Sequence, residues 1–394
     1  MVSPISISIQ PRPQARVEVS PLSILLVIGK IDLVPTTHVT IGATAGDVTE
    51  ITDANVATML GAVATTSPAT QTPLGRAAYD LIEATSSVHV YVLPFAVDSS
   101  DSPAERATKV ASALTGALGD PVQLAKFPDS GLDLIVLPRE CAVSATAPTV
   151  IAALKTVCAS LESVALVDAG DSGAAADARP ASTAPSVADL RTWAGANGGV
   201  EVYALSNRGD VANYNAMWGS VIMAAHHARW ASREGVGSSP YDLTHPLAGA
   251  ANLTPARVLS LTDGSSDAVA LDRDYELGSL VVHGGNSYIW GGQSNPGAAV
   301  DAREQIANHV VANRSLKIAR DIAARVIRRR ATGDRIQALR LDIETAIADA
   351  YVPDSMRDVE VDTPTLAGRV LTVPYSLRFH EYIQAVSMTA EVYV

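Results

Sequence analysis

VHVYVL at Val88–Leu93 is a run of apolar and aromatic residues apart from His89, and Pro94 follows it directly. Such a run predicts a buried strand, because a strand that is covered on both faces shows no polar alternation. A helix is predicted next, over Pro103–Leu118, with its proline in the first turn, where the missing N–H costs nothing. A second apolar run, Leu132–Leu137, again ends at a proline. These elements indicate an α/β pattern.

The pattern extends in both directions from this stretch. Apolar strands that alternate with helices predict a mostly parallel sheet with helices on both faces. Further strands are expected over Leu22–Gly29, Val164–Asp168 and Val200–Leu205. Further helices are expected over Ala54–Ala64, Leu74–Glu83, Thr149–Leu161, Ala184–Ala194 and Tyr214–Trp230.

The pattern changes after Arg233–Asn252, a segment rich in Gly, Ser and Pro that we interpret as a loop or boundary. Leu277–Val282 and Tyr288–Gly291 predict a hairpin around a Gly-Gly-Asn turn. Two long helices are expected after it, over Ala299–Arg330 and Ile336–Ala350, with Gly333 between them. The rest of the chain is predicted to form strands.

Both ends of the chain alternate between apolar and polar residues, which is the periodicity of a strand. A Pro-Arg-Pro segment separates the amino-terminal strand from the next extended segment, so this strand has no obvious partner in its own domain. Leu371–Phe379 is predicted as one alternating strand, and a last strand reaches the final residue. The apolar positions of the two ends are Ile5, Ile7, Ile9, Met388, Ala390, Val392 and Val394.

Composition limits the classes of function. The 394 residues suggest two or three domains, at roughly 100–200 residues each. The formal net charge of -12 argues against a nucleic-acid-binding protein, which is usually basic. The longest apolar run is far shorter than the roughly 20 residues of a membrane helix, and we expect no signal peptide and no secretion by the general route. Cys141 and Cys158 are expected to be reduced and buried.

Several short motifs match catalytic or metal sites in residue order but lack the structural context that those sites need. Ser172 lies in a Gly-Asp-Ser-Gly sequence, but the α/β pattern before it is not the trypsin context, so a surface loop is expected. His283 begins an oxyanion-like His-Gly-Gly, for which a hairpin turn is the better interpretation. His226 and His227 are adjacent on a helix and cannot form an i, i+4 zinc pair, so packed or surface histidines are expected. We therefore predict no catalytic residue, no metal and no cofactor.

Two further motifs lead to the same conclusion. The acidic residues Asp263, Asp267, Asp272 and Asp274 do not have the spacing of an EF-hand and predict a solvated loop. Gly29 and Lys30 follow a strand, but the hydroxyl residue and helix start of a phosphate-binding loop are missing.

One predicted helix is strongly basic, whereas the chain as a whole is acidic. It contains a single acid, Asp321, among seven basic residues. Two interpretations stay open: a solvated helix face, or docking onto an acidic partner surface, another subunit included. The basic residues are Arg314, Lys317, Arg320, Arg325, Arg328, Arg329 and Arg330.

The carboxyl-terminal part, about residues 215–394, resembles the contractile-tail sheath family, especially the compact subunits of P2-like phages and R-type pyocins. Four features in the same order carry the resemblance. They are Trp230 followed by Gly237–Pro240, the hairpin followed by Trp290-Gly291, the long helix with a second helix after it, and a strand-rich end with a free last strand.

The resemblance implies a fold in two parts: a subtilisin-like α/β outer domain without a working triad, and a carboxyl-terminal α+β sheath core domain. The implied division is an amino-terminal arm at residues 1–21, the outer domain at 22–250, the inner core domain at 251–384 and a strand arm at 385–394. In this family the terminal arms add strands to the sheets of neighbouring subunits, and the apolar arm residues would be the anchors.

The resemblance also implies a function. The chain would be a structural subunit of a contractile tail, assembled in a host cytoplasm, that polymerises around an inner tube and contracts without nucleotide. Its partners would be other copies, the tube protein and the baseplate and terminator proteins, with no direct nucleic acid and no membrane insertion. Arg325, Arg328, Arg329 and Arg330 are the expected tube contacts. A serine hydrolase and another self-assembling tail or shell component are the alternatives.

Overall fold

The structure is a computed structural model of the whole chain. It describes residues 21–29, 44–52, 88–98, 100–128, 131–143, 145–170, 187–197, 199–206, 219–237, 239–247, 259–260, 271, 277–291, 294–295, 305–324, 332–352, 355–367 and 370–379. The helices predicted over Ala54–Ala64 and Leu74–Glu83, and both terminal arms, lie outside these residues.

A seven-stranded sheet forms the centre of the first lobe, in the order β2-β3-β1-β4-β5-β6-β10. The five inner strands are parallel, and a short antiparallel strand closes each edge, so the predicted mostly parallel sheet is confirmed. The subtilisin-like assignment stays a prediction. The strands are β1 (Ser23–Gly29), β2 (Thr49–Ile51), β3 (His89–Phe95), β4 (Leu134–Leu137), β5 (Val164–Ala169), β6 (Gly199–Ser206) and β10 (Ser294–Asn295).

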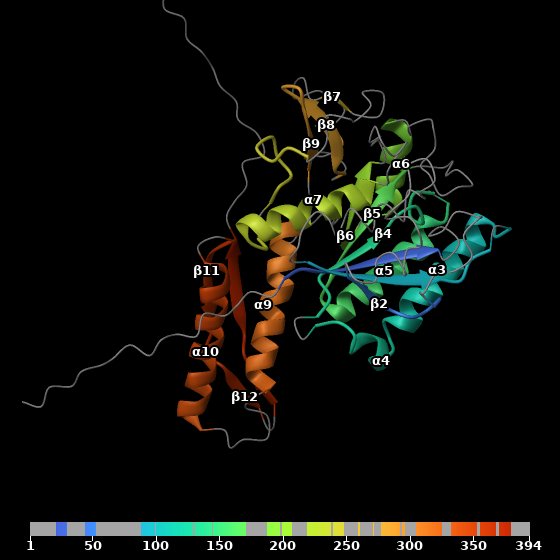
Figure 1. The fold of residues 1–394 in the computed structure, drawn as a ribbon. Helices are drawn as coiled ribbons and strands as arrows, with labels where there is room; N and C mark the ends of the chain where they lie inside the picture. Colours follow the sequence, from blue (N-terminus) through green and yellow to red (C-terminus); the bar gives the residue numbers. More distant parts are fainter. Residues whose placement is uncertain are drawn as a thin grey trace, which may run out of the picture.

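Helices cover both faces of this sheet, as the apolar strands require. Side chains of β1 alternate between the two cores: Leu26 packs on one face and Leu25 on the other, and both are fully buried. Helix α7 (Gly219–Glu234) covers the first face. Helices α3 (Pro103–Ala117), α5 (Ala147–Leu161) and α6 (Val187–Asn197) cover the second (Figure 1). We call this sheet with its helices the α/β body.

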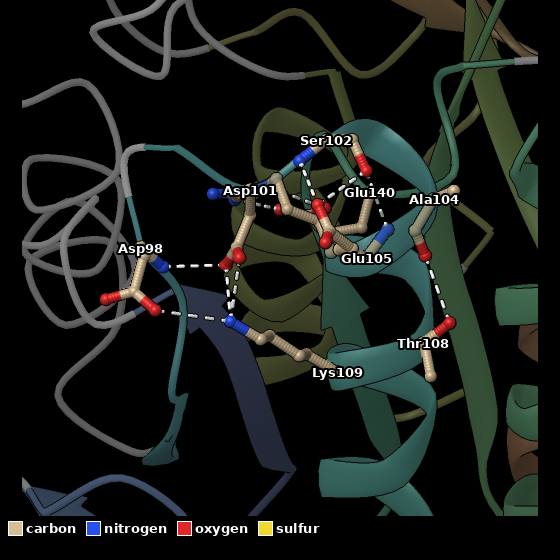
Figure 2. Close-up of polar contacts among 9 residues, drawn as sticks. Asp98, Asp101, Ser102, Ala104, Glu105, Thr108, Lys109 and Glu140 are labelled. Atoms are coloured by element: carbon tan, nitrogen blue, oxygen red, sulfur yellow. Dashed lines mark hydrogen bonds and ion pairs between the residues drawn. The ribbon is translucent and has the colours of Figure 1, made fainter.

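The start of α3 illustrates how local sequence positions a helix (Figure 2). Ser102 and Glu105 form a capping box: the Ser102 hydroxyl accepts from the Glu105 N–H at 3.3 Å, and the Ser102 N–H donates to the Glu105 carboxylate at 2.8 Å. Lys109 donates to Asp101 at 2.7 Å and to Asp98 at 3.3 Å, which fixes the loop before the cap. The helix predicted over Pro103–Leu118 is thus confirmed to within one residue.

Several predicted ends differ, each for a local reason. α5 begins at Ala147, two residues before the predicted start, because Pro148 is tolerated in the first turn. α7 continues past Trp230 to Glu234 and ends at Gly235, whose φ of +102° favours glycine. α6 is described over Val187–Asn197, and its predicted start at Ala184 lies outside the described residues.

The predicted hairpin is confirmed as β8 (Ser279–His283) and β9 (Asn286–Trp290). Gly284 and Gly285 both have positive φ, +58° and +83°, as a tight two-residue hairpin turn requires. The short β7 (Leu259–Ser260) pairs with β8 in parallel. Leu280 and Ile289 of the hairpin pack in the α/β core, which favours a domain boundary nearer to residue 305 than to 251. The domain limits themselves stay a prediction.

The C-terminal lobe contains two long helices and two strand pairs. Its helices are α9 (Ile306–Ala324) and α10 (Gly333–Tyr351), and its ribbons pair β11 (Met356–Val361) with β14 (Tyr375–Phe379) and β12 (Thr365–Ala367) with β13 (Val370–Thr372). α10 includes Gly333 as its first residue, three residues before the predicted start. The single strand predicted over Leu371–Phe379 is wrong: Pro374 cannot donate to a ladder and separates β13 from β14.

Helix α9 belongs to both lobes. Ile306 and Val310 pack in the core of the α/β body, whereas Val311, Ala319 and Ile322 pack in the core of the C-terminal lobe. In Figure 1, α9 stands between the sheet and α10. One continuous helix therefore packs in the cores of both lobes.

Candidate functional site

Helix α9 crosses the edge at which the parallel strands of the α/β body begin. Asp133 directly precedes β4, Glu162 lies just before β5, and the chain enters β1 at Ser23. Parallel strands begin at the same edge of a sheet, so these positions lie along that edge. Three basic side chains of α9, three residues apart and hence on one helix face, reach them: Arg314, Lys317 and Arg320.

The central contact is a buried, bidentate ion pair between the lobes. Arg314 Nε donates to Asp133 Oδ1 at 2.9 Å, and its Nη2 donates to Oδ2 at 2.6 Å. The side chains are only 4% and 1% exposed. Asp133 also accepts the N–H of Ser23 at 2.9 Å, and Arg314 donates to the carbonyl of Pro21 at 2.8 Å. The pair therefore joins α9, β4 and the entry of the chain into β1.

The electrostatics of this pair favour the charged forms. Burial by itself would raise the pKa of Asp133, but the charge and hydrogen bonds of Arg314, with Lys317 and the Ser23 N–H, hold it below its usual value. Burial would likewise lower the pKa of Arg314, and Asp133 reverses this and raises it. Tyr351, whose pKa burial raises to about 12, is a further hydrogen-bond partner of Arg314.

Lys317 is the weaker partner of Asp133. Its Nζ lies 3.8 Å from the carboxylate and donates to the Leu132 carbonyl at 2.8 Å. The ion pair would raise the pKa of Lys317, but burial outweighs it and lowers the pKa. We therefore assign the main electrostatic contact to Arg314.

Arg320 extends the contact with Glu162, at the solvent-exposed end of the row. Glu162 caps α5 in the left-handed conformation, φ +51°, which is unusual for a residue other than glycine, Asn or Asp. Its carboxylate pairs with Arg320, which is 63% exposed. The first three members of the basic cluster thus dock on the acidic edge of their own α/β body. The sequence-based hypothesis of docking on a partner remains for the other four.

A second contact between the lobes depends on a glycine. A Cβ added at Gly237 would lie 1.9 Å from Oγ and 2.1 Å from Cβ of Ser355, which no real side chain tolerates. Ser355 immediately precedes β11, and its N–H donates to the Tyr351 carbonyl at 2.8 Å. The loop after α7, part of the segment that carries the sequence resemblance, therefore needs glycine for this close approach. We call the Asp133–Arg314 pair and the Gly237–Ser355 contact the joint.

The ribbon β11–β14 has an apolar face that is only partly buried. Among the described residues it has only two strands, and a two-stranded sheet is marginal in water. Tyr375, Leu377 and Phe379 alternate on one face of β14 and are only partly buried. Unpaired strand edges are templates for pairing with another chain.

The residues that the sequence analysis assigned to strand exchange and to the tube lie outside the described residues. Their roles stay predictions. The arm residues are Ile5, Ile7, Ile9, Met388, Ala390, Val392 and Val394, and the tube residues are Arg325, Arg328, Arg329 and Arg330.

Catalytic and metal chemistry finds little support in the described residues. Ser220 is fully buried at the start of α7, and its hydroxyl donates to the buried Asp168 at 2.7 Å, whereas a serine nucleophile donates to an imidazole. His226 and His227 are buried, and so are Cys141 and Cys158, as expected. No described group of three His, Cys, Asp or Glu side chains could hold a metal, and no described helix is long and apolar enough to cross a membrane. Ser172 and the four loop aspartates lie outside these residues.

Comparison with known proteins gives no match by sequence but a match by structure. No family model and no curated protein matches the chain. A chain of the anti-feeding prophage helical sheath in its contracted state matches with a TM-score of 0.60 at 11% identity, over 99% of both chains. The chain has a contractile-sheath fold. The predicted resemblance is thereby confirmed at the level of the fold.

Other solved sheath folds agree. The contracted sheath complex of PVC, an extracellular contractile injection system, matches with a TM-score of 0.61 at 12% identity, over 99% of this chain and 98% of that one. The sheath tail protein of Desulfitobacterium hafniense matches with a TM-score of 0.50 at 10% identity, over 96% and 100%. These matches cover nearly the full length of the chain.

The acidic half of the joint was not predicted from the sequence. Asp133 and Glu162 lie just before apolar strands, and a charged residue at that place is ordinarily a loop residue. Three basic residues spaced three apart were the available signal, since one helix face with that spacing needs a partner surface. Only the fold brings that face to the start of β4 and β5.

Proposed function

We propose that the chain is a structural subunit of a contractile sheath, without catalytic activity. It polymerises around an inner tube and contracts to drive the tube through a target envelope. The sheath fold along the whole chain carries the proposal, supported by matches to sheath chains in the contracted state. The particle is a phage tail, which would eject a genome, or a phage-like injection system.

Strand exchange is the proposed means of attachment. The apolar residues of the two arms would anchor strands that neighbouring copies add to the ribbon β11–β14, whose described form is two-stranded. Backbone hydrogen bonds contribute about 0.5–1.5 kcal/mol each, and burial of each Ile or Val adds about 1.5–3 kcal/mol. The half-exposed face of Tyr375, Leu377 and Phe379 supplies apolar surface for that burial.

The joint suits a subunit that moves as one body. Because α9 is shared by both cores and fixed by a buried ion pair, the lobes would re-pack against neighbours without rearranging internally. Contraction then consists of a change between two packings of the lattice. The arms keep the copies connected during that change.

The remaining partners are inferred from the same role. Arg325, Arg328, Arg329 and Arg330 come directly after α9 in the sequence and are proposed to contact the inner tube. Baseplate and terminator proteins would bind the two ends of the sheath. No cofactor, direct nucleic-acid contact or membrane insertion is part of the proposal.

Negative-stain microscopy of the purified chain tests the proposal. Long hollow cylinders with regular striations are expected at high concentration. Deletion of Met1–Gln10 or of Ser387–Val394 should give folded chains that do not polymerise. A full-length chain that stays monomeric at high concentration, with and without a tube protein, would contradict the proposal. A fluorophosphonate probe that labels a serine would instead favour the hydrolase alternative.

A further inference from the structure

His227 is a buried imidazole with no hydrogen-bond partner. It lies on α7, is 0% exposed, and neither of its ring nitrogens has a partner among the described residues. Its ring stacks on Tyr241, with centroids 5.8 Å apart and planes 7° apart, and the Tyr241 hydroxyl is also buried without a described partner. An orphaned buried polar group destabilises a fold, so this position calls for an explanation.

The charged groups around His227 are those of the joint. Asp133 before β4 and Arg314 on α9 both act on it electrostatically, and His226 is its neighbour on α7. His226 contacts the carbonyl of Pro240 at 2.8 Å through Nε2, so α7 is tied to the loop that follows Gly237. Beyond this first layer lie Lys317, next to Asp133, and Arg229, Asp242 and His245, next to His226.

We propose that His227 makes the joint acid-sensitive: its protonation releases α9 and the entry of β1 from the α/β body while the sheet itself stays folded. A proton on His227 would add a further cation to the buried region that already holds Arg314. Asp133 cannot balance it, because its oxygens already accept from Arg314 and from the Ser23 N–H. Opening the joint is the route by which the imidazolium reaches solvent.

The direction of the pH effect is set by linkage. Burial, with smaller contributions from His226 and Arg314, lowers the pKa of His227 from 6.5 to about 4 in the closed joint. An open joint restores a value near 6.5, so stability of the closed state is complete above that pH and falls as the pH drops toward 4. At pH 5 the linkage relation favours opening about thirtyfold relative to neutral pH.

Hydrogen exchange of the full chain, read by mass spectrometry at pH 7.5 and pH 5.0 and corrected for the intrinsic rates, tests the proposal. Protection of α9, Ile306–Ala324, and of the Ser23 amide, which donates to Asp133, should fall about thirtyfold at pH 5.0. Protection of β5, Val164–Ala169, should not change. Equal loss at all three places, or no loss at pH 5.0, would overturn the proposal.

Two variants assign the effect to His227. His227→Phe keeps a ring against Tyr241 and removes both orphaned nitrogens, and His227→Gln is a smaller neutral replacement if the first does not fold. Either should abolish the loss of protection at pH 5.0. The matched control is His89→Gln, which removes an exposed histidine that pairs with Glu50 and should leave the loss unchanged. Retention of the acid effect in both His227 variants would refute the assignment.

This inference goes beyond the proposed sheath role and does not depend on it. The exchange experiment reports on the joint of a single chain, whether or not that chain assembles. Failure of the acid effect would leave the sheath proposal standing, and absence of cylinders would leave the acid-sensitive joint standing.

Discussion

Arg314 and Asp133 form a buried, bidentate ion pair with N···O distances of 2.6 and 2.9 Å, although the two residues are 181 positions apart in the sequence. Around this pair α9, β4 and the start of β1 meet, and both cores of the molecule reach it through α9. This pair is therefore the buried charged contact between α9 and the α/β body.

Removing one partner of this pair should be costly. We expect Arg314→Ala or Asp133→Asn to lower the free energy of unfolding by about 3–5 kcal/mol, because each leaves a buried charge without compensation. The double variant Arg314→Met with Asp133→Leu should recover most of the loss. Urea titration followed by tryptophan fluorescence measures all three.

The exposed pair supplies the control for that series. Arg320→Ala removes the partner of Glu162 at a position that is 63% exposed, so a loss of only about 0–1 kcal/mol is expected. Equal losses for Arg314→Ala and Arg320→Ala would show that burial does not distinguish the two pairs.

Acid should lower the free energy of unfolding of the whole chain in two separate ranges of pH. The pKa values of His226 and His227 are lowered to about 4, so their contribution to stability is lost between pH 6.5 and 4. Asp133 has a pKa below its usual 3.8, so its contribution is present above that value and is lost only as the pH falls further. The free energy of unfolding, measured from pH 8 to pH 2.5, should fall in both ranges. In Asp133→Asn the fall at low pH should become smaller, and the fall between pH 6.5 and 4 should stay. The reverse result would show that the two falls are assigned to the wrong groups.

Gly237→Ala tests the close approach to Ser355. We expect a loss of about 1–3 kcal/mol, since the added methyl overlaps the side chain of Ser355. Adding Ser355→Gly should restore part of this stability. Gly116→Ala is the control: it lies in α3 with no atom near its Cβ, and it should stabilise the helix by about 0.5–1 kcal/mol. If Gly237→Ala is as well tolerated as Gly116→Ala, the loop does not need a glycine.

The proposed acceptor face can be tested by a matched pair on β14. Leu377→Glu puts a charge on the partly buried face, and we expect it to raise the concentration needed for polymerisation at least about tenfold, equivalent to about 1.4 kcal/mol. Ser376→Lys changes the exposed face opposite Glu360 and should be neutral. Sedimentation of the two variants at a series of concentrations gives the comparison. Equal polymerisation of the two variants would show that this face of β14 does not bind a strand of a neighbouring copy.

Much of the α/β body could be predicted from sequence because its signals are local. Apolar runs located β3 and β4, and Pro103 in a first turn located the start of α3. The strand end expected at Pro94 is wrong, because β3 continues through Pro94 to Phe95. The break between β13 and β14 was not predicted, because the alternation of apolar and polar residues continues across Pro374. The joint could not be predicted, since Asp133 and Arg314 are brought together only by the packing of α9 across the sheet edge.

Strand exchange is the central claim, and mixed cross-linking tests it most directly. Chains with cysteine in place of Glu391 or Ser8 in an arm are mixed, before polymerisation, with chains of different mass that carry cysteine in place of Ser376 on β14 or Glu360 on β11. Cys141 and Cys158 are buried and do not compete. We expect disulfides between chains of different mass. If the two cysteines form a disulfide only when they are placed in the same chain, each arm pairs with the ribbon of its own chain. Strand exchange between subunits would then be wrong.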